Sequence, residues 1–99
     1  MHYLLFYDVV DDYVNKRTPF RELHLQKVRQ SYDGGELVLA GALADPVDGA
    51  VLVFRDADKA EAFAKSDPYV SNGLVRKWRV REWTTVIGTD AQVVLPPGL

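Results

Sequence analysis

Residues 37–54 have the sequence LVLAGALADPVDGAVLVF, in which two apolar runs flank a turn. The runs, residues 37–43 and 50–54, are dominated by aliphatic and β-branched residues, which is typical of buried strands. The residues between them include four that favour tight turns: Asp45, Pro46, Asp48 and Gly49. The segment therefore predicts a β-hairpin, around which the rest of the chain can be placed.

A helix is predicted before this hairpin, over residues 19–32. Thr18 can cap its free amides, Pro19 is tolerated at the first helical position, and Gly34 favours its end. Side chains at helical spacing are expected to form one inward-facing stripe, with two neighbours beside it: Arg21, Leu25, Val28 and Tyr32, flanked by Phe20 and His24.

A second and shorter helix is predicted after the hairpin. Asp56 can cap its first turn, and Pro68 disfavours helical geometry at Asp67, which sets its end. Its apolar stripe is formed by Ala60, Phe63 and Ala64.

One further strand is predicted at each end of the pattern. Residues 3–10 form a short aromatic and β-branched run, and residues 74–87 form a last strand in which Trp78 and Val80 alternate with basic residues. The order β-α-β-β-α-β is that of the ferredoxin-like fold, an α+β architecture with a four-stranded antiparallel sheet. Residues 1–88 are expected to form this domain and residues 89–99 a loosely held C-terminal tail.

Composition excludes several classes of protein. The chain has 99 residues, 47% hydrophobic and 26% charged, which fits one globular domain and excludes disorder. A net charge of −2 gives no field to attract nucleic acid or an anionic membrane, so neither is expected as a partner. No cysteine is present, which excludes disulfides and thiolate metal sites. A cytoplasmic location is expected, since no signal-peptide pattern or membrane-length apolar run occurs.

The sheet itself predicts an assembly. Its first three strands are apolar at nearly every position, so the face away from the helices needs cover, and a two-fold homodimer through the sheet faces is expected to supply it. A ligand pocket is expected between the sheet and its partner. The aromatic candidates for the two sheet faces are Phe6, Tyr7, Phe54, Trp78 and Trp83.

His24 and Asp67 are the residues to test for chemistry. His24 flanks the stripe of the first helix, and Asp67 stands at the exit of the second, on the same side of the sheet. A carboxylate that accepts one imidazole N–H fixes the tautomer and leaves the other nitrogen as a base. Sequence alone leaves open a packed histidine and a turn-forming aspartate before proline. His2 is expected to be a frayed terminal residue without a role.

Other patterns are weaker. The chain has no histidine or carboxylate cluster with metal-ligand spacing, so no metal is expected. The basic and aromatic run at residues 76–81 is interpreted as a solvated strand face rather than a nucleic-acid surface.

Several short motifs resemble the YCII-related (YciI-like) family over about residues 1–87. They are Lys16-Arg17 followed by Arg21 and His24, Gly35-x-Leu37-x3-Gly41, and Asp67-Pro68-Tyr69 with Asn72-Gly73-Leu74. The resemblance implies a dimeric α/β barrel and an active-site pair of His24 and Asp67. The chain departs from the family where Gly41-Ala42 replaces Gly-Pro and Asn72-Gly73 replaces Ala-Gly, so a different pocket rim is expected.

The functional expectation follows from the residues and the resemblance together. We expect a small dimeric enzyme that uses His24 as general acid/base, oriented by Asp67, on a small anionic or phenolic substrate, without a cofactor. Arg17, Arg21 and Tyr69 are the candidate substrate-binding residues, and a lyase, isomerase or dehalogenating reaction is expected. The alternative is a non-catalytic ligand-binding or accessory module whose histidine and aspartate only tie two helices together.

Overall fold

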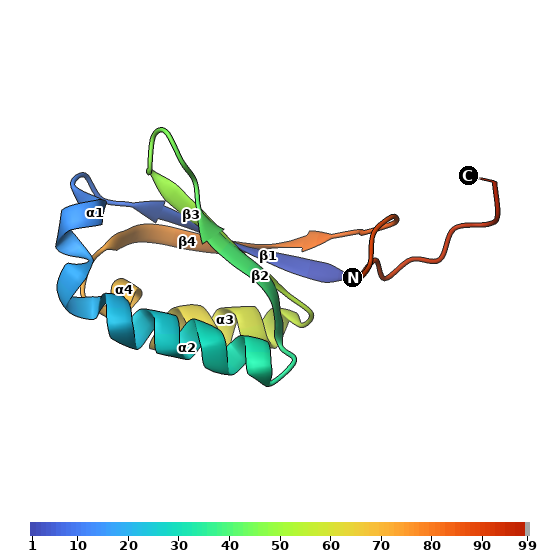
Figure 1. Cartoon of the computed structure of the whole chain (residues 1–99), viewed down its shortest axis with the longest axis horizontal. Helices are drawn as coiled ribbons and strands as arrows, with labels where there is room; N and C mark the ends of the chain where they lie inside the picture. The colour runs from blue at the N-terminus through green and yellow to red at the C-terminus, as the bar shows by residue number, and fades with distance from the viewer. Residues whose placement is uncertain (99) are drawn as a thin grey trace.

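The computed structural model describes residues 1–98 and has one four-stranded antiparallel sheet with helices on one of its faces (Figure 1). The strands follow the order β2-β3-β1-β4 and are β1 (His2–Val9), β2 (Leu37–Ala42), β3 (Gly49–Phe54) and β4 (Val75–Trp83). The two long helices are α2 (Arg21–Asp33) and α3 (Ala57–Ser66). The predicted ferredoxin-like α+β architecture is confirmed, although β4 is shorter than the strand predicted over residues 74–87.

Three short helical elements were not predicted: α1 (Tyr13–Lys16), the 3-10 turn η1 (Thr18–Phe20) and α4 (Pro68–Ser71). The predicted capping role of Thr18 is wrong, because Thr18 lies inside η1 and its side chain makes no cap hydrogen bond. Pro19 occupies this tight turn, and α2 begins two residues later. The predicted end of the second helix is confirmed, because α3 stops at Ser66 and α4 begins at Pro68.

The core lies between the sheet and α3. Alternate residues of β1, including Leu5 and Tyr7, face the helices and are at most 2% exposed. Helix α3 contacts β1, β3 and β4, and its predicted stripe is buried: Ala60, Phe63 and Ala64.

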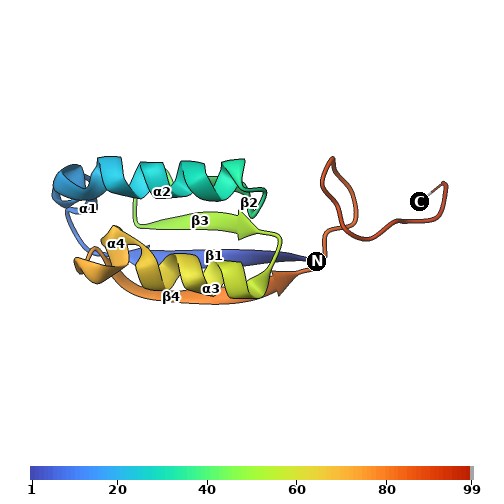
Figure 2. The ribbon, with the colours of Figure 1, turned by 90° about the horizontal axis from the view of Figure 1, so that it is seen from below.

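Helix α2 lies on the same face of the sheet as α3, over the half that contains β2 and β3 (Figure 2). The prediction that one stripe of this helix is buried is wrong, because α2 has no buried residue. Leu25 and Tyr32 of that stripe are 47% and 54% exposed. Beyond the buried Leu37, the edge strand β2 has only the small side chains of Ala40 and Ala42 on the helix side, so a gap remains beneath α2.

No helix covers the second face of the sheet within residues 1–98 (Figure 1). Of the aromatic candidates, Phe6 and Trp83 belong to this open face, whereas the register places Tyr7, Phe54 and Trp78 on the helix side. Leu39 on the same open face is 70% exposed. This apolar face is the surface for which the sequence predicts a partner. In the described part of the chain, no helix is long and apolar enough to cross a membrane.

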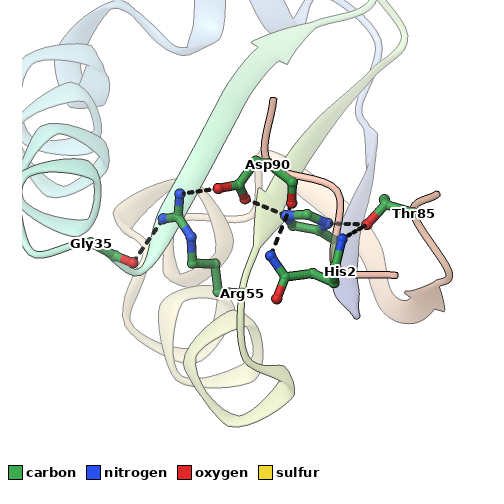
Figure 3. A network of polar contacts seen from close by, with 6 residues as sticks. His2, Gly35, Arg55, Thr85 and Asp90 are labelled. Atoms are coloured by element: carbon green, nitrogen blue, oxygen red, sulfur yellow. Dashed lines mark hydrogen bonds and ion pairs between the residues drawn. The ribbon is translucent and has the colours of Figure 1, made fainter. Parts of the chain in front are cut away.

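The expectation for His2 is wrong, because this residue is 3% exposed and anchors the segment after β4 (Figure 3). Its Nδ1 lies 2.7 Å from Thr85 Oγ1, and its Nε2 contacts Asp90 Oδ2. Arg55 donates to the other Asp90 oxygen at 3.0 Å and to the carbonyl of Gly35 at 2.9 Å.

The hydrogen bond from His2, aided by Arg55, lowers the pKa of Asp90 below its ordinary value. The beginning of the predicted loose tail is therefore held against the sheet, and beyond it the chain runs away from the domain (Figure 1). Leu99, the last residue of that predicted tail, lies outside the described residues.

Candidate active site

The fold brings His24 of α2 and Asp67, the residue between α3 and α4, into direct contact. The Nδ1–H of His24 donates to Oδ1 of Asp67 across 2.8 Å. Local sequence could not show this contact, because the two residues are 43 positions apart and lie on different elements. The contact forms because both helical layers cover the same face of the sheet.

Asp67 is fully buried and is held by two further donors. The hydroxyl of Tyr7 donates to Oδ2 at 2.7 Å, and the backbone N–H of Tyr69 donates to Oδ1 at 3.0 Å. The second contact caps α4, so the turn role of an aspartate before Pro68 is present together with the histidine contact. A buried carboxylate requires such partners to offset its desolvation.

Tyr7 is a site residue that sequence reasoning did not single out as a partner of Asp67. Burial, together with the nearby Asp67 charge, raises the pKa of Tyr7 far above the ordinary tyrosine value. The protonated phenol is the form that donates to the carboxylate. No local pattern reveals this contact, because only the register of β1 within the sheet directs Tyr7 toward Asp67.

Aromatic rings fix the orientation of the His24 imidazole. Tyr69 stacks on it with a centroid separation of 3.8 Å and an interplanar angle of 6°. Phe63 meets it edge-on at 6.2 Å. Tyr69 therefore lies against the His24 ring, and burial raises the pKa of its own phenol to about 12.

The second nitrogen of His24 is open. Within residues 1–98, no protein atom forms a hydrogen bond with Nε2. Because no side-chain nitrogen or oxygen in this part of the chain is both fully buried and without a partner, Nε2 is accessible to solvent. The side chain of His24 is 13% exposed. With Nδ1–H donated to Asp67, Nε2 carries the lone pair and can accept a proton.

The His24 side chain lines a cavity of about 170 Å³ between α2 and the β2–β3 hairpin. This cavity lies on the helix side of the sheet, where β2 carries alanines. The expected pocket between the sheet and a partner copy stays a prediction. The predicted residues His24, Arg17, Arg21 and Tyr69 all line it. The remaining walls are mostly apolar and include Leu25, Val28, Leu52 and the alanines at positions 40, 42 and 50.

The two arginines give the cavity a positive rim. The Arg17 guanidinium lies over the Tyr13 ring, 5.2 Å from its centroid. Neither Arg17 nor Arg21 forms an ion pair with a carboxylate of residues 1–98. Two guanidinium groups without acidic partners, beside an open imidazole, can bind an anionic or hydroxylated ligand. In the same described residues, no group of three or more potential ligands could hold a metal ion.

Known proteins agree with this arrangement at the level of family and fold. The YCII-related domain matches residues 1–84. Protein YciI of Escherichia coli O6:H1 and that of Shigella flexneri are each 28% identical to the chain over 97 residues, covering 87% of it and 99% of the relative.

Among solved structures, 5-chloro-2-hydroxyhydroquinone dehydrochlorinase from Burkholderia phenoliruptrix, in complex with 2,5-dihydroxybenzoquinone, is similar with a TM-score of 0.71. It is 17% identical, and the match covers 87% of this chain and 96% of that one. At this identity the likeness shows the fold.

Proposed function

The chain belongs to the YCII-related family, and we propose that it is an enzyme in which His24 acts as general acid and base on a small phenolic or anionic substrate. The observation that carries the proposal is that Nδ1 of His24 pairs with Asp67, Nε2 has no hydrogen-bond partner among residues 1–98, and the His24 side chain lines the cavity. A nitrogen that is free of protein partners can accept a proton from a ligand in the cavity. Imidazole is also the side chain best suited to proton transfer near neutral pH.

The reaction begins with a neutral His24 whose tautomer is set by Asp67. Nε2 takes the proton from a substrate hydroxyl, which gives an imidazolium and a phenolate. The imidazolium then returns the proton to a ring carbon as the phenolate electrons shift onto that carbon, forming the keto tautomer. Where that carbon bears chlorine, loss of chloride and of a second hydroxyl proton yields a quinone, so the class of reaction is isomerisation or dehalogenation.

Arg17 and Arg21 hold the negative oxygen that develops in this sequence. Their guanidinium groups line the same cavity as His24 and have no carboxylate partner among residues 1–98. Charge-assisted hydrogen bonds from arginine stabilise a phenolate or carboxylate more strongly than neutral donors do. The similar dehydrochlorinase was solved with a dihydroxybenzoquinone, which supports a phenolic ring as the ligand.

A non-catalytic ligand-binding or accessory module is the second candidate, and one observation favours it. Asp67 caps α4 and accepts a hydrogen bond from the Tyr7 hydroxyl. These two contacts stabilise the buried carboxylate without His24. In this reading His24 is a structural partner, and the cavity binds a ligand without converting it.

The assembly belongs to the same proposal. A second copy of the chain covers the open sheet face, where Leu4, Phe6, Val51 and Val53 are half-buried and Leu39 is exposed. Because the cavity lies on the helix side, this homodimer is not needed to enclose it. A cytoplasmic location for the dimer stays a prediction.

The test is proton exchange at the ring carbons of 2-hydroxyhydroquinone in anaerobic D₂O, followed by ¹H NMR. His24→Gln is expected to lower the exchange rate by ~10²- to 10⁴-fold, the usual contribution of a general base. Arg21→Gln is expected to raise KM, whereas Lys16→Gln, which removes a charge outside the cavity lining, leaves the rate unchanged. Equal exchange by wild type and His24→Gln, with both folded, would favour the non-catalytic module.

A further inference from the structure

We infer that three alanines of the β2–β3 hairpin restrict the ligand of the cavity to a single six-membered ring, and that Leu25 is the side chain that excludes a second ring. The inference rests on the proposed function, because it concerns the ligand of the same site.

Two rows of paired residues on the helix side of the sheet end in alanine at β2. In one row of paired residues on the helix side, Trp78 is opposite Tyr7, Tyr7 is opposite Ala50, and Ala50 is opposite Ala42. The large rings at β4 and β1 fill the space beneath the helices, whereas methyl groups at β3 and β2 leave it open. This row therefore ends in a gap under α2.

The neighbouring row repeats the pattern. Val80 is opposite Leu5, Leu5 is opposite Leu52, and Leu52 is opposite Ala40. Only the residue on the edge strand is small, so Ala40 extends the gap along β2. Ala50 is buried, whereas Ala40 and Ala42 are exposed, so the gap is a cleft that opens to solvent along the edge strand. Larger side chains at these three positions would fill it.

Leu25 closes the cavity from the helix. It lines the cavity together with Val28, yet it is 47% exposed, so one side of it faces solvent and the other faces the ligand space. It also lines the shallow grooves on either side of α2. Truncation of Leu25 thus joins the cavity to open surface without removing a buried core residue.

The size of the cavity fits one ring. Its volume of about 170 Å³ is close to the ~150 Å³ of an apolar cavity that takes up benzene. It is well below the ~300 to 1,000 Å³ typical of pockets for drug-sized ligands. His24 and Arg21 then orient the hydroxyl of a monocyclic phenol, while the alanines contact its flat ring.

The experiment measures binding of phenol and of 2-naphthol to the full chain by NMR chemical-shift titration. Wild type is expected to bind phenol and to bind 2-naphthol at least tenfold more weakly. Ala42→Leu fills the gap and is expected to weaken phenol binding at least tenfold. Leu25→Ala opens the wall and is expected to strengthen 2-naphthol binding at least tenfold. Ala62→Leu adds the same volume at an exposed position of α3 and is expected to change neither affinity.

The inference is overturned if wild type binds both probes equally, if it binds neither, or if Ala42→Leu keeps the phenol affinity. Ala50→Val is a second filling variant, with the same expected loss, should Ala42→Leu fail to fold. The His24→Gln variant distinguishes a failure of the proposed function from a failure of the size limit. If that variant retains ring-proton exchange while the affinities for phenol and 2-naphthol follow the expected pattern, the size limit stands and the catalytic role of His24 does not.

Discussion

The Tyr7 hydroxyl donates a 2.7 Å hydrogen bond to Oδ2 of Asp67, while Oδ1 of the same carboxylate receives the Nδ1–H of His24. Tyr7 belongs to the central strand β1 and is 2% exposed. The carboxylate that orients the candidate base is therefore attached to the sheet core. Rigid support of this kind is what holds a reacting group in one position.

Tyr7→Phe tests this attachment. Removal of the hydroxyl leaves buried Oδ2 without a donor, and we expect the free energy of unfolding to fall by ~1 to 3 kcal/mol. Urea denaturation measures the change. Tyr32→Phe is the matched control, because Tyr32 is 54% exposed and its hydroxyl has no hydrogen bond to residues 1–98, so a change within about 0.5 kcal/mol is expected. A loss in Tyr7→Phe no larger than in the control would contradict the attachment.

Asp67→Ala and His24→Gln separate the structural role of the pair from its chemical one. Asp67→Ala leaves three donors unpartnered and removes the cap of α4, so we expect a loss of more than about 2 kcal/mol in the free energy of unfolding. His24→Gln leaves Asp67 with two donors, and we expect a loss of about 1 kcal/mol. Thermal melts with calorimetry compare them. Equal losses would support a purely structural pair.

The elements of the fold could be predicted because their signals are local. Continuous apolar runs identify the strands, and proline or glycine at positions such as Pro68 and Gly34 identifies the helix ends. The pairing of His24 with Asp67 was expected through the family resemblance. Local sequence left open a packed histidine and a turn-forming aspartate before proline. The catalytic and substrate-binding roles of His24, Asp67, Arg17, Arg21 and Tyr69 stay predictions.

What could not be predicted depends on packing between distant elements. The exposure of Leu25, the contact of Tyr7 with Asp67 and the side on which the cavity lies all follow from sheet register and from where α2 crosses the edge strand. The anchoring of His2 by Asp90 joins residues 88 positions apart and has no local pattern.

Asp90 predicts a pH dependence of stability. Its pKa is lowered in the folded state by His2 and Arg55, so its contribution is fully present above the unfolded value of about 3.9 and is lost as pH falls through the folded value. We expect Asp90→Asn to unfold at lower urea concentration than wild type at pH 6, and the difference between the two midpoints to shrink as the pH falls below about 3.9. A difference that persists unchanged at low pH would show that the charge of Asp90 is not its cause.

The open sheet face predicts the state of assembly. Analytical ultracentrifugation at micromolar concentration is expected to show a species of twice the 11.2 kDa chain mass. Its interface should bury at least about 1,200 Å². Val51→Asp places a charge on that face and is expected to shift the species to monomer. Glu61→Gln changes an exposed residue of α3 and is expected to leave the dimer intact. A wild-type monomer, or a dimer through the helices, would refute the assembly.

The most direct measurement is a crystal structure of the chain soaked with 2,5-dihydroxybenzoquinone, the ligand of the similar dehydrochlorinase. The account predicts density for its ring in the cavity between α2 and the β2–β3 hairpin, with an oxygen at hydrogen-bond distance of about 2.6 to 3.2 Å from His24 Nε2. A second oxygen is expected near Arg17 or Arg21. Density on the open sheet face, or a ligand in the cavity that leaves Nε2 without a contact, would contradict the assignment of His24 as the reacting base.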